Sequence, residues 1–253
     1  MDESSENDCF QIQLLSCSHV LDERDPGGTR AGTPDNVGPA RRASPPGQTV
    51  LADLHSHEGL RGSFESPRAR RYAAFDLQVA GPVTPRDGGL FRTDSRKALW
   101  LERDGLLTAA GIAGPEFLGW SMNDRDQQTG PFPLNPTAVV EYVYEFLRFV
   151  YEVLAPRVPS GRWTFRMVAT GWKSLRGGLT LTPGRAEEAW HQTRQPASGD
   201  RLDDQIEGTG SMERDAYTLL ERFYGLFGLP ATAIPFTANG SVSINLIPKG
   251  FTP

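Results

Sequence analysis

Two stretches of the chain place apolar residues at the 3.6-residue spacing of an amphipathic helix. The first begins at Asn135, a good N-cap, with Pro136 at the first helical position, and it runs to Ala155-Pro156, which cannot continue a helix. Its apolar stripe is wide, so we expect this helix to be mostly buried against one face of a sheet. The stripe contains Val139, Val143, Phe146, Val150 and Val153, and Glu141, Glu145, Arg148 and Glu152 form one narrow charged line.

The second helical stretch begins near Ser211. Glu213 and Asp215 lie in its first turn, where negative charge complements the helix dipole. Gly228, followed by Leu229-Pro230, marks its end. The preceding string Gly208-Thr209-Gly210-Ser211 has N–H groups that could hold an anion, but it lacks a P-loop lysine and is already explained as a capped helix start.

Strands are predicted where apolar and polar residues alternate with a period of two. Residues 97–103 and 106–112 flank Asp104-Gly105, a dipeptide suited to a tight turn, and they predict a hairpin. The segment 184–210 is ambiguous. Further strands are predicted at 72–79, 163–169, 179–181 and 242–246, the last after an Asn239-Gly240 turn.

These patterns predict an α+β fold, with a mainly antiparallel sheet packed by two long amphipathic helices. Residues 22–48 are rich in Pro, Gly, Arg, Asp and Ser, and they offer too little apolar surface to offset the entropy of ordering. Ahead of them, a short apolar island over residues 10–21 could dock as a strand or a helix, or be an unfolded remnant. We therefore predict a disordered or weakly ordered arm over residues 1–65 and a single domain over 66–253.

Composition agrees with a chain that folds only in part. Of its 253 residues 38% are hydrophobic, the mean hydropathy is -0.41 and the net charge is -5. Nothing global therefore attracts nucleic acid or a membrane surface. The start is acidic where a secretory signal is basic, and no apolar run approaches the roughly 18 residues of a membrane span, so we expect a cytoplasmic protein with no membrane association. Cys9 and Cys17 both lie in the arm, which excludes a stabilising disulfide framework.

One string suggests metal chemistry. In Asp53-Leu54-His55-Ser56-His57, an extended backbone would point both imidazoles the same way, and the aspartate could join them. The string resembles the first metal-binding motif of the polymerase and histidinol phosphatase phosphoesterases, and loosely that of the amidohydrolases. This resemblance implies a hydrolase that uses zinc or another divalent metal at Asp53, His55 and His57. Those families add further ligands along a barrel, whereas His19 and His191 are the other histidines here. A solvated polar turn is the favoured alternative.

A basic cluster follows this string. Arg61, Arg68, Arg70 and Arg71 are interleaved with aromatic residues, a combination that can contact phosphate and stack on bases. The hypothesis of nucleic-acid or anion contact rests on these four arginines. A charged, solvated entry to a strand is the favoured alternative, because the chain as a whole is acidic.

Three segments carry a second resemblance, namely residues 141–156 (EYVYEFLRFVYEVLAP), 163–168 and 215–237 (DAYTLLERFYGLFGLPATAIPFT). With the order of elements from about Ala80 onward, roughly two thirds of the chain, these segments resemble the region that follows the DNA-binding domain in bacterial Schlafen-type AlbA proteins. The resemblance implies a bacterial accessory module, and it does not carry the DNA-binding role over to this chain.

These observations favour a non-enzymatic regulatory or interaction module, which needs no cofactor and binds a protein partner or the rest of a longer chain. The metal-dependent hydrolase and the nucleic-acid binder remain as alternatives.

Overall fold

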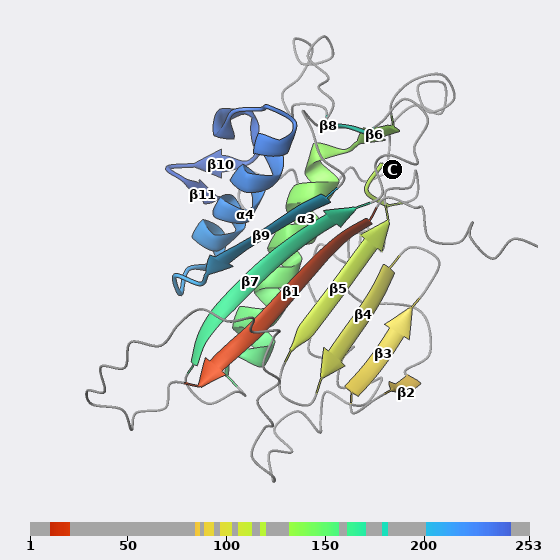
Figure 1. Cartoon of the computed structure of the whole chain (residues 1–253). Coiled ribbons are helices and arrows are strands. Elements are labelled where there is room, and N and C mark those ends of the chain that lie inside the picture. The colour runs from red at the N-terminus through yellow and green to blue at the C-terminus, as the bar shows by residue number, and fades with distance from the viewer. Residues whose placement is uncertain are drawn as a thin grey trace, which may run out of the picture.

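The fold consists of one large antiparallel sheet with helices on one of its faces (Figure 1). The sheet has seven strands in the order β2-β3-β4-β5-β1-β7-β9, and every neighbouring pair runs antiparallel. The predicted α+β class with a mainly antiparallel sheet is therefore confirmed. The computed structural model describes residues 11–20, 84–86, 89–93, 97–102, 106–112, 117–119, 132–156, 161–170, 179–181 and 201–243.

The strands of the large sheet are β1 (Gln11–Val20), β2 (Thr84–Arg86), β3 (Gly89–Thr93), β4 (Lys97–Glu102), β5 (Leu107–Ile112), β7 (Gly161–Thr170) and β9 (Arg201–Glu207). Two small sheets accompany it. In one, β6 (Phe132–Leu134) pairs in parallel with β8 (Leu179–Leu181), and in the other β10 (Thr237–Ala238) pairs with β11 (Ser241–Val242). The helical elements are α3 (Pro136–Arg148), the π-helical segment η3 (Phe149–Leu154), α4 (Met212–Leu226) and the short 3-10 turn η6 (Ala231–Ala233).

Strand β1 lies between β5 and β7 (Figure 1). It pairs with β7 over all ten of its residues, and Leu14 at its centre is fully buried. The short apolar segment over residues 10–21 could, from the sequence, be a strand, a helix or an unfolded remnant. It is a strand over residues 11–20. These residues belong to the sheet, although they fall within the segment 1–65 predicted as an arm. For the rest of that segment the boundary stays a prediction.

The predicted hairpin is confirmed. β4 and β5 pair antiparallel with Leu101 opposite Leu107, and the N–H of Glu102 donates to the carbonyl of Leu106 at 2.8 Å. Leu99 and Leu101 are buried, whereas Trp100 between them is partly exposed. The hairpin therefore turns one face toward the core and the other away from it.

The first predicted helix is confirmed at its start and differs near its end. The side chain of Asn135 accepts hydrogen bonds from the N–H groups of Thr137 and Ala138, at 2.9 and 3.3 Å. After Arg148 the helix widens into η3, where Ala155 donates to the carbonyl of Val150, five residues back. The helix lies against one face of the sheet (Figure 1). As expected it is mostly buried, and even Glu141 and Glu145 of its charged line are only 8% and 5% exposed.

The second predicted helix is α4, which packs against α3 and β9 (Figure 1). The Ser211 side chain caps its start by accepting from the N–H of Arg214. Gly228 ends it with φ +64°, a conformation that glycine adopts without strain, and Leu229 donates back to the carbonyl of Tyr224. Asn239 and Gly240, both with positive φ, form the predicted turn between β10 and β11.

The core fills the space between the sheet and the two helices. Its largest fully buried side chains include Tyr142, Phe146, Phe165, Phe223 and Tyr224. Trp163 is 8% exposed and contributes to this core. Among the described helices none is long and apolar enough to cross a membrane. The predicted strand at 72–79 lies outside the described residues.

Candidate functional site

The residues predicted to carry chemistry lie outside the part of the chain that the structure describes. This holds for the candidate metal ligands Asp53, His55 and His57 and for the basic cluster Arg61, Arg68, Arg70 and Arg71. Both hypotheses therefore stay predictions. Within the described ranges, no group of three or more His, Cys, Asp or Glu residues is arranged to hold a metal ion.

The most connected polar group in the described residues is the carboxylate of Asp215. Asp215 is fully buried in the first turn of α4. Tyr151 of η3 donates its hydroxyl to Asp215 Oδ2 at 2.5 Å. Thr209 adds its backbone N–H, 3.1 Å from both carboxylate oxygens, and its hydroxyl, 2.8 Å from Oδ1. The carboxylate therefore ties η3, the loop before α4 and α4 itself together.

The same contacts decide whether the string Gly208-Thr209-Gly210-Ser211 is an anion site or a capped helix start. Gly210 N–H donates to the Tyr151 hydroxyl at 3.3 Å, and Ser211 N–H donates to the Thr209 hydroxyl at 3.3 Å. Together with the Ser211 cap, these bonds use the N–H groups that an anion would otherwise bind. The prediction of a capped helix start is confirmed.

Desolvation changes the ionisation of the tyrosines around these helices. Burial and the hydrogen bond to Asp215 raise the pKa of Tyr151 far above its ordinary value. Burial, followed by the charge of Glu213, raises the pKa of Tyr144 to about 12. In the core, burial alone raises the pKa of Tyr142 and Tyr224 still further. Within the part of the chain that the structure describes, the hydroxyls of Tyr142 and Tyr224 have no hydrogen-bond partner.

The face of the sheet that points away from α3 carries a row of aromatic and small side chains. Trp100 alternates with the buried Leu99 and Leu101, so it must point to the opposite face. Phe91 and Thr108 are its direct neighbours on β3 and β5, and all three are partly exposed. We call this surface the open face. The Nε1 atom of Trp100 is buried there and has no hydrogen-bond partner among the described residues.

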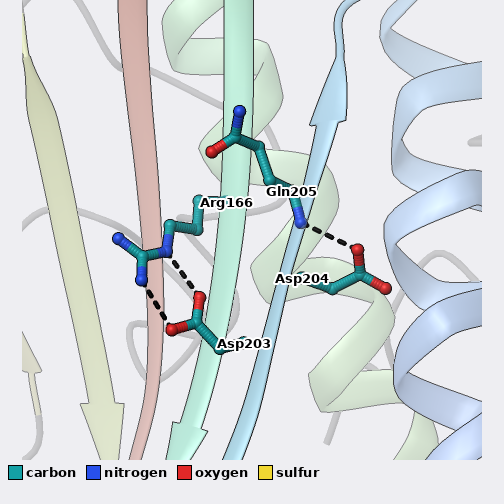
Figure 2. Close-up of polar contacts among 4 residues, drawn as sticks. All are labelled: Arg166, Asp203, Asp204 and Gln205. Carbon is teal, nitrogen blue, oxygen red and sulfur yellow. Dashed lines mark hydrogen bonds and ion pairs between the residues drawn. The ribbon is translucent and has the colours of Figure 1, made fainter. Parts of the chain in front are cut away.

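Toward β9 the open face becomes charged. Figure 2 shows the Arg166 guanidinium of β7 joined to the Asp203 carboxylate of β9 by two parallel hydrogen bonds, each 2.5 Å long. This pairing raises the pKa of Arg166. A bidentate pair fixes both side chains in one geometry, which makes it the best-defined polar feature of the open face.

β9 is the last strand of the sheet within the described residues, so one of its sides lacks a strand partner there. At this side the backbone N–H of Gln205 donates to Oδ1 of the neighbouring Asp204 at 2.8 Å (Figure 2). Oδ2 of the same carboxylate lies 3.8 Å from Nε of Arg222 on α4. Asp204 therefore caps a backbone donor that a further strand would use.

Sequence reasoning missed strand β9 with its Asp204 cap, and it missed the hydrogen-bond network around Asp215. β9 falls in the segment 184–210 that the pattern left ambiguous, because Leu202 and Ile206 are its sole apolar residues. The helix dipole accounts for Asp215 in the sequence, and no local signal pairs it with Tyr151. Asp215 stands four residues before Leu219 and eight before Phe223, and this place on the apolar stripe of the helix is a signal that points to a buried network.

The fold and these contacts define a class of protein: an α+β domain whose antiparallel sheet carries helices on one face and an aromatic, charge-edged surface on the other. No family model, curated protein or solved structure matches the chain. The resemblance to Schlafen-type AlbA proteins therefore stays a prediction.

Proposed function

We propose that this chain is a non-enzymatic regulatory or interaction module of a bacterial, cytoplasmic protein, and that it binds a protein partner through the open face. The observation that carries the proposal is the position of the described helices. In the described part of the chain, α3 and α4 pack on a single face of the sheet (Figure 1). On the opposite face Trp100, Phe91 and Thr108 are partly exposed.

The chemistry of the open face fits a protein partner. Aromatic side chains are enriched at the centres of protein interfaces, where they bury large areas, and charged pairs are common at the rims. Here the Phe91–Trp100 pair lies within the sheet and the Arg166–Asp203 pair lies toward its edge.

The best-connected carboxylate supports the non-enzymatic part of the proposal. The carboxylate of Asp215 accepts hydrogen bonds from the Tyr151 hydroxyl and from the N–H and hydroxyl of Thr209. Its oxygens therefore hold η3 and α4 together. An arrangement of this kind is typical of a structural network, in which the polar groups satisfy one another. The resemblance to an accessory region that follows a DNA-binding domain agrees with a partner-binding role.

Site-specific photo-crosslinking tests the proposal. A benzophenone amino acid at Thr108 on the open face is expected to give one discrete adduct with a partner in cells, and mass spectrometry identifies that partner. The same amino acid at Glu221, exposed on α4, is the matched control and is expected to give none. Robust turnover by the purified chain on a panel of phosphoesters and esters, with and without Zn²⁺ or Mn²⁺, would overturn the non-enzymatic role.

A further inference from the structure

β9 has one side that no strand of the described residues pairs with, and this side has the geometry to accept another strand. In an antiparallel pair, alternate residues direct their backbone groups toward the partner strand and away from it. Gly208 N–H donates to the carbonyl of Trp163 on β7, so the even-numbered positions of β9 face β7. Asp203, Gln205 and Glu207 therefore direct their N–H and C=O groups outward, and the capped Gln205 N–H agrees with this assignment.

The side chains along this edge are acidic. From residue 203 to 207 the strand reads Asp-Asp-Gln-Ile-Glu, and Asp203, Gln205 and Glu207 are exposed on the open face. Arg166 holds Asp203 in the bidentate pair, whereas Arg162 lies 3.9 Å from Glu207 and Arg222 lies 3.8 Å from Asp204. The Arg162–Glu207 pair is so exposed that it contributes little, so a cation from a partner can replace Arg162 at Glu207.

A second copy of β9 is a poor partner for this edge. In the antiparallel register that pairs all three outward positions, Asp203 of one copy would face Glu207 of the other. Like charges directly opposite each other destabilise a strand pair, whereas opposite charges stabilise it. An extended segment with Lys or Arg at alternate positions would instead place a cation beside each acid.

We propose that the β9 edge binds a basic, extended peptide segment by strand addition, and that Asp204 restrains this binding by capping the Gln205 N–H. The proposal rests on the proposed function and names the class of partner. Main-chain hydrogen bonds hold the added strand, and the alternating charges select it. Asp204 blocks the edge as natural edge strands are often blocked, by a charged side chain, and it must release Gln205 before a strand is added.

The test uses a synthetic peptide in which lysine and threonine alternate, and a matched peptide with glutamate in place of lysine. The lysine peptide is expected to bind the full chain and to slow amide hydrogen exchange at Gln205, and the glutamate peptide is not. Asp204→Ala and Asp204→Asn are both uncharged, but only asparagine keeps an acceptor oxygen near the Gln205 N–H. The alanine variant is therefore expected to bind about three- to fivefold more tightly than the asparagine variant, which is the effect of one hydrogen bond.

Gln205→Pro is the matched variant that is expected to lose peptide binding. Proline is tolerated on an edge strand where the missing N–H points outward, so this variant is expected to fold and to lose the peptide. Unchanged binding to Gln205→Pro, or no slowing of exchange at Gln205 in the wild-type chain, overturns the proposal. If Gln205→Pro does not fold, two other measurements decide whether the proposal holds. They are amide hydrogen exchange at Gln205 in the wild-type chain and the ratio of the peptide affinities of Asp204→Ala and Asp204→Asn. A Thr108 adduct without peptide binding removes the edge proposal and leaves the interaction module standing.

Discussion

Tyr151 and Asp215 are 64 positions apart in the sequence, and a 2.5 Å hydrogen bond joins the hydroxyl of one to the carboxylate of the other. The tyrosine belongs to η3 and the aspartate to the first turn of α4. Because Asp215 is fully buried, this bond and those from Thr209 supply the hydrogen-bond partners that its carboxylate oxygens need. The pair therefore holds the end of one helix to the start of the other.

Tyr151→Phe tests this junction. It removes the hydroxyl and leaves a buried carboxylate with one donor fewer, so we expect the free energy of unfolding to fall by about 1.5–3 kcal/mol. Urea denaturation measures the change. Tyr217→Phe on α4 is the control, because within the described residues its hydroxyl makes no hydrogen bond, and it is expected to change stability little. Equal effects of the two substitutions would contradict a special role for the Tyr151–Asp215 bond.

Gly208→Ala and Gly225→Ala are expected to have opposite effects. A Cβ at Gly208 would lie 2.9 Å from both the Phe165 ring and the Tyr151 hydroxyl, and 3.1 Å from the Trp163 carbonyl, so we expect a loss of about 1–3 kcal/mol. A Cβ at Gly225 meets nothing within 4 Å, and alanine favours the helix interior, so we expect a gain of about 0.5–1 kcal/mol. Thermal unfolding of both variants provides the comparison. Stabilisation by Gly208→Ala would show that the loop is not closely packed there.

The sequence predicts what local chemistry determines. Asn135 and Gly228 mark helix ends because a cap acts within a few residues of itself, and the hairpin is visible because its strands are adjacent. β9 is a strand because β7 pairs with it, and its own residues alternate too weakly to show it. The Asp204 cap and the Tyr151–Asp215 bond depend on such distant pairings. The candidate metal and arginine strings stay untested, since they lie outside the described residues.

Tyr142→Phe and Tyr224→Phe are expected to stabilise the protein. Both hydroxyls are buried and have no hydrogen-bond partner in the described ranges, a desolvation cost that phenylalanine does not carry. We expect the free energy of unfolding to rise by about 0.5–1.5 kcal/mol for each, opposite in sign to the effect of Tyr151→Phe. Calorimetry of the single variants and the double variant measures it. A loss of more than about 1 kcal/mol would mean that the hydroxyl has a bonding partner in solution.

The same hydroxyls predict how stability depends on alkaline pH. Burial raises the pKa of Tyr142 in the folded chain, whereas in the unfolded chain it ionises near its ordinary value of about 10. Below pH 10 both states hold the proton, so the stabilisation is fully present. Above it the unfolded state loses the proton that the folded state keeps, and the free energy of unfolding falls as the pH rises.

Tyr142→Phe should therefore weaken this dependence, reducing the loss between pH 10 and 11 by about 1 kcal/mol. Urea titrations at pH 9, 10 and 11 measure it. Thr218→Ala removes a hydroxyl that bonds the Arg214 carbonyl and does not titrate, so it should keep the wild-type slope. Parallel slopes for the wild type and Tyr142→Phe would show that water reaches the Tyr142 hydroxyl in the folded chain, and that the space around it is less closed than the buried ring indicates.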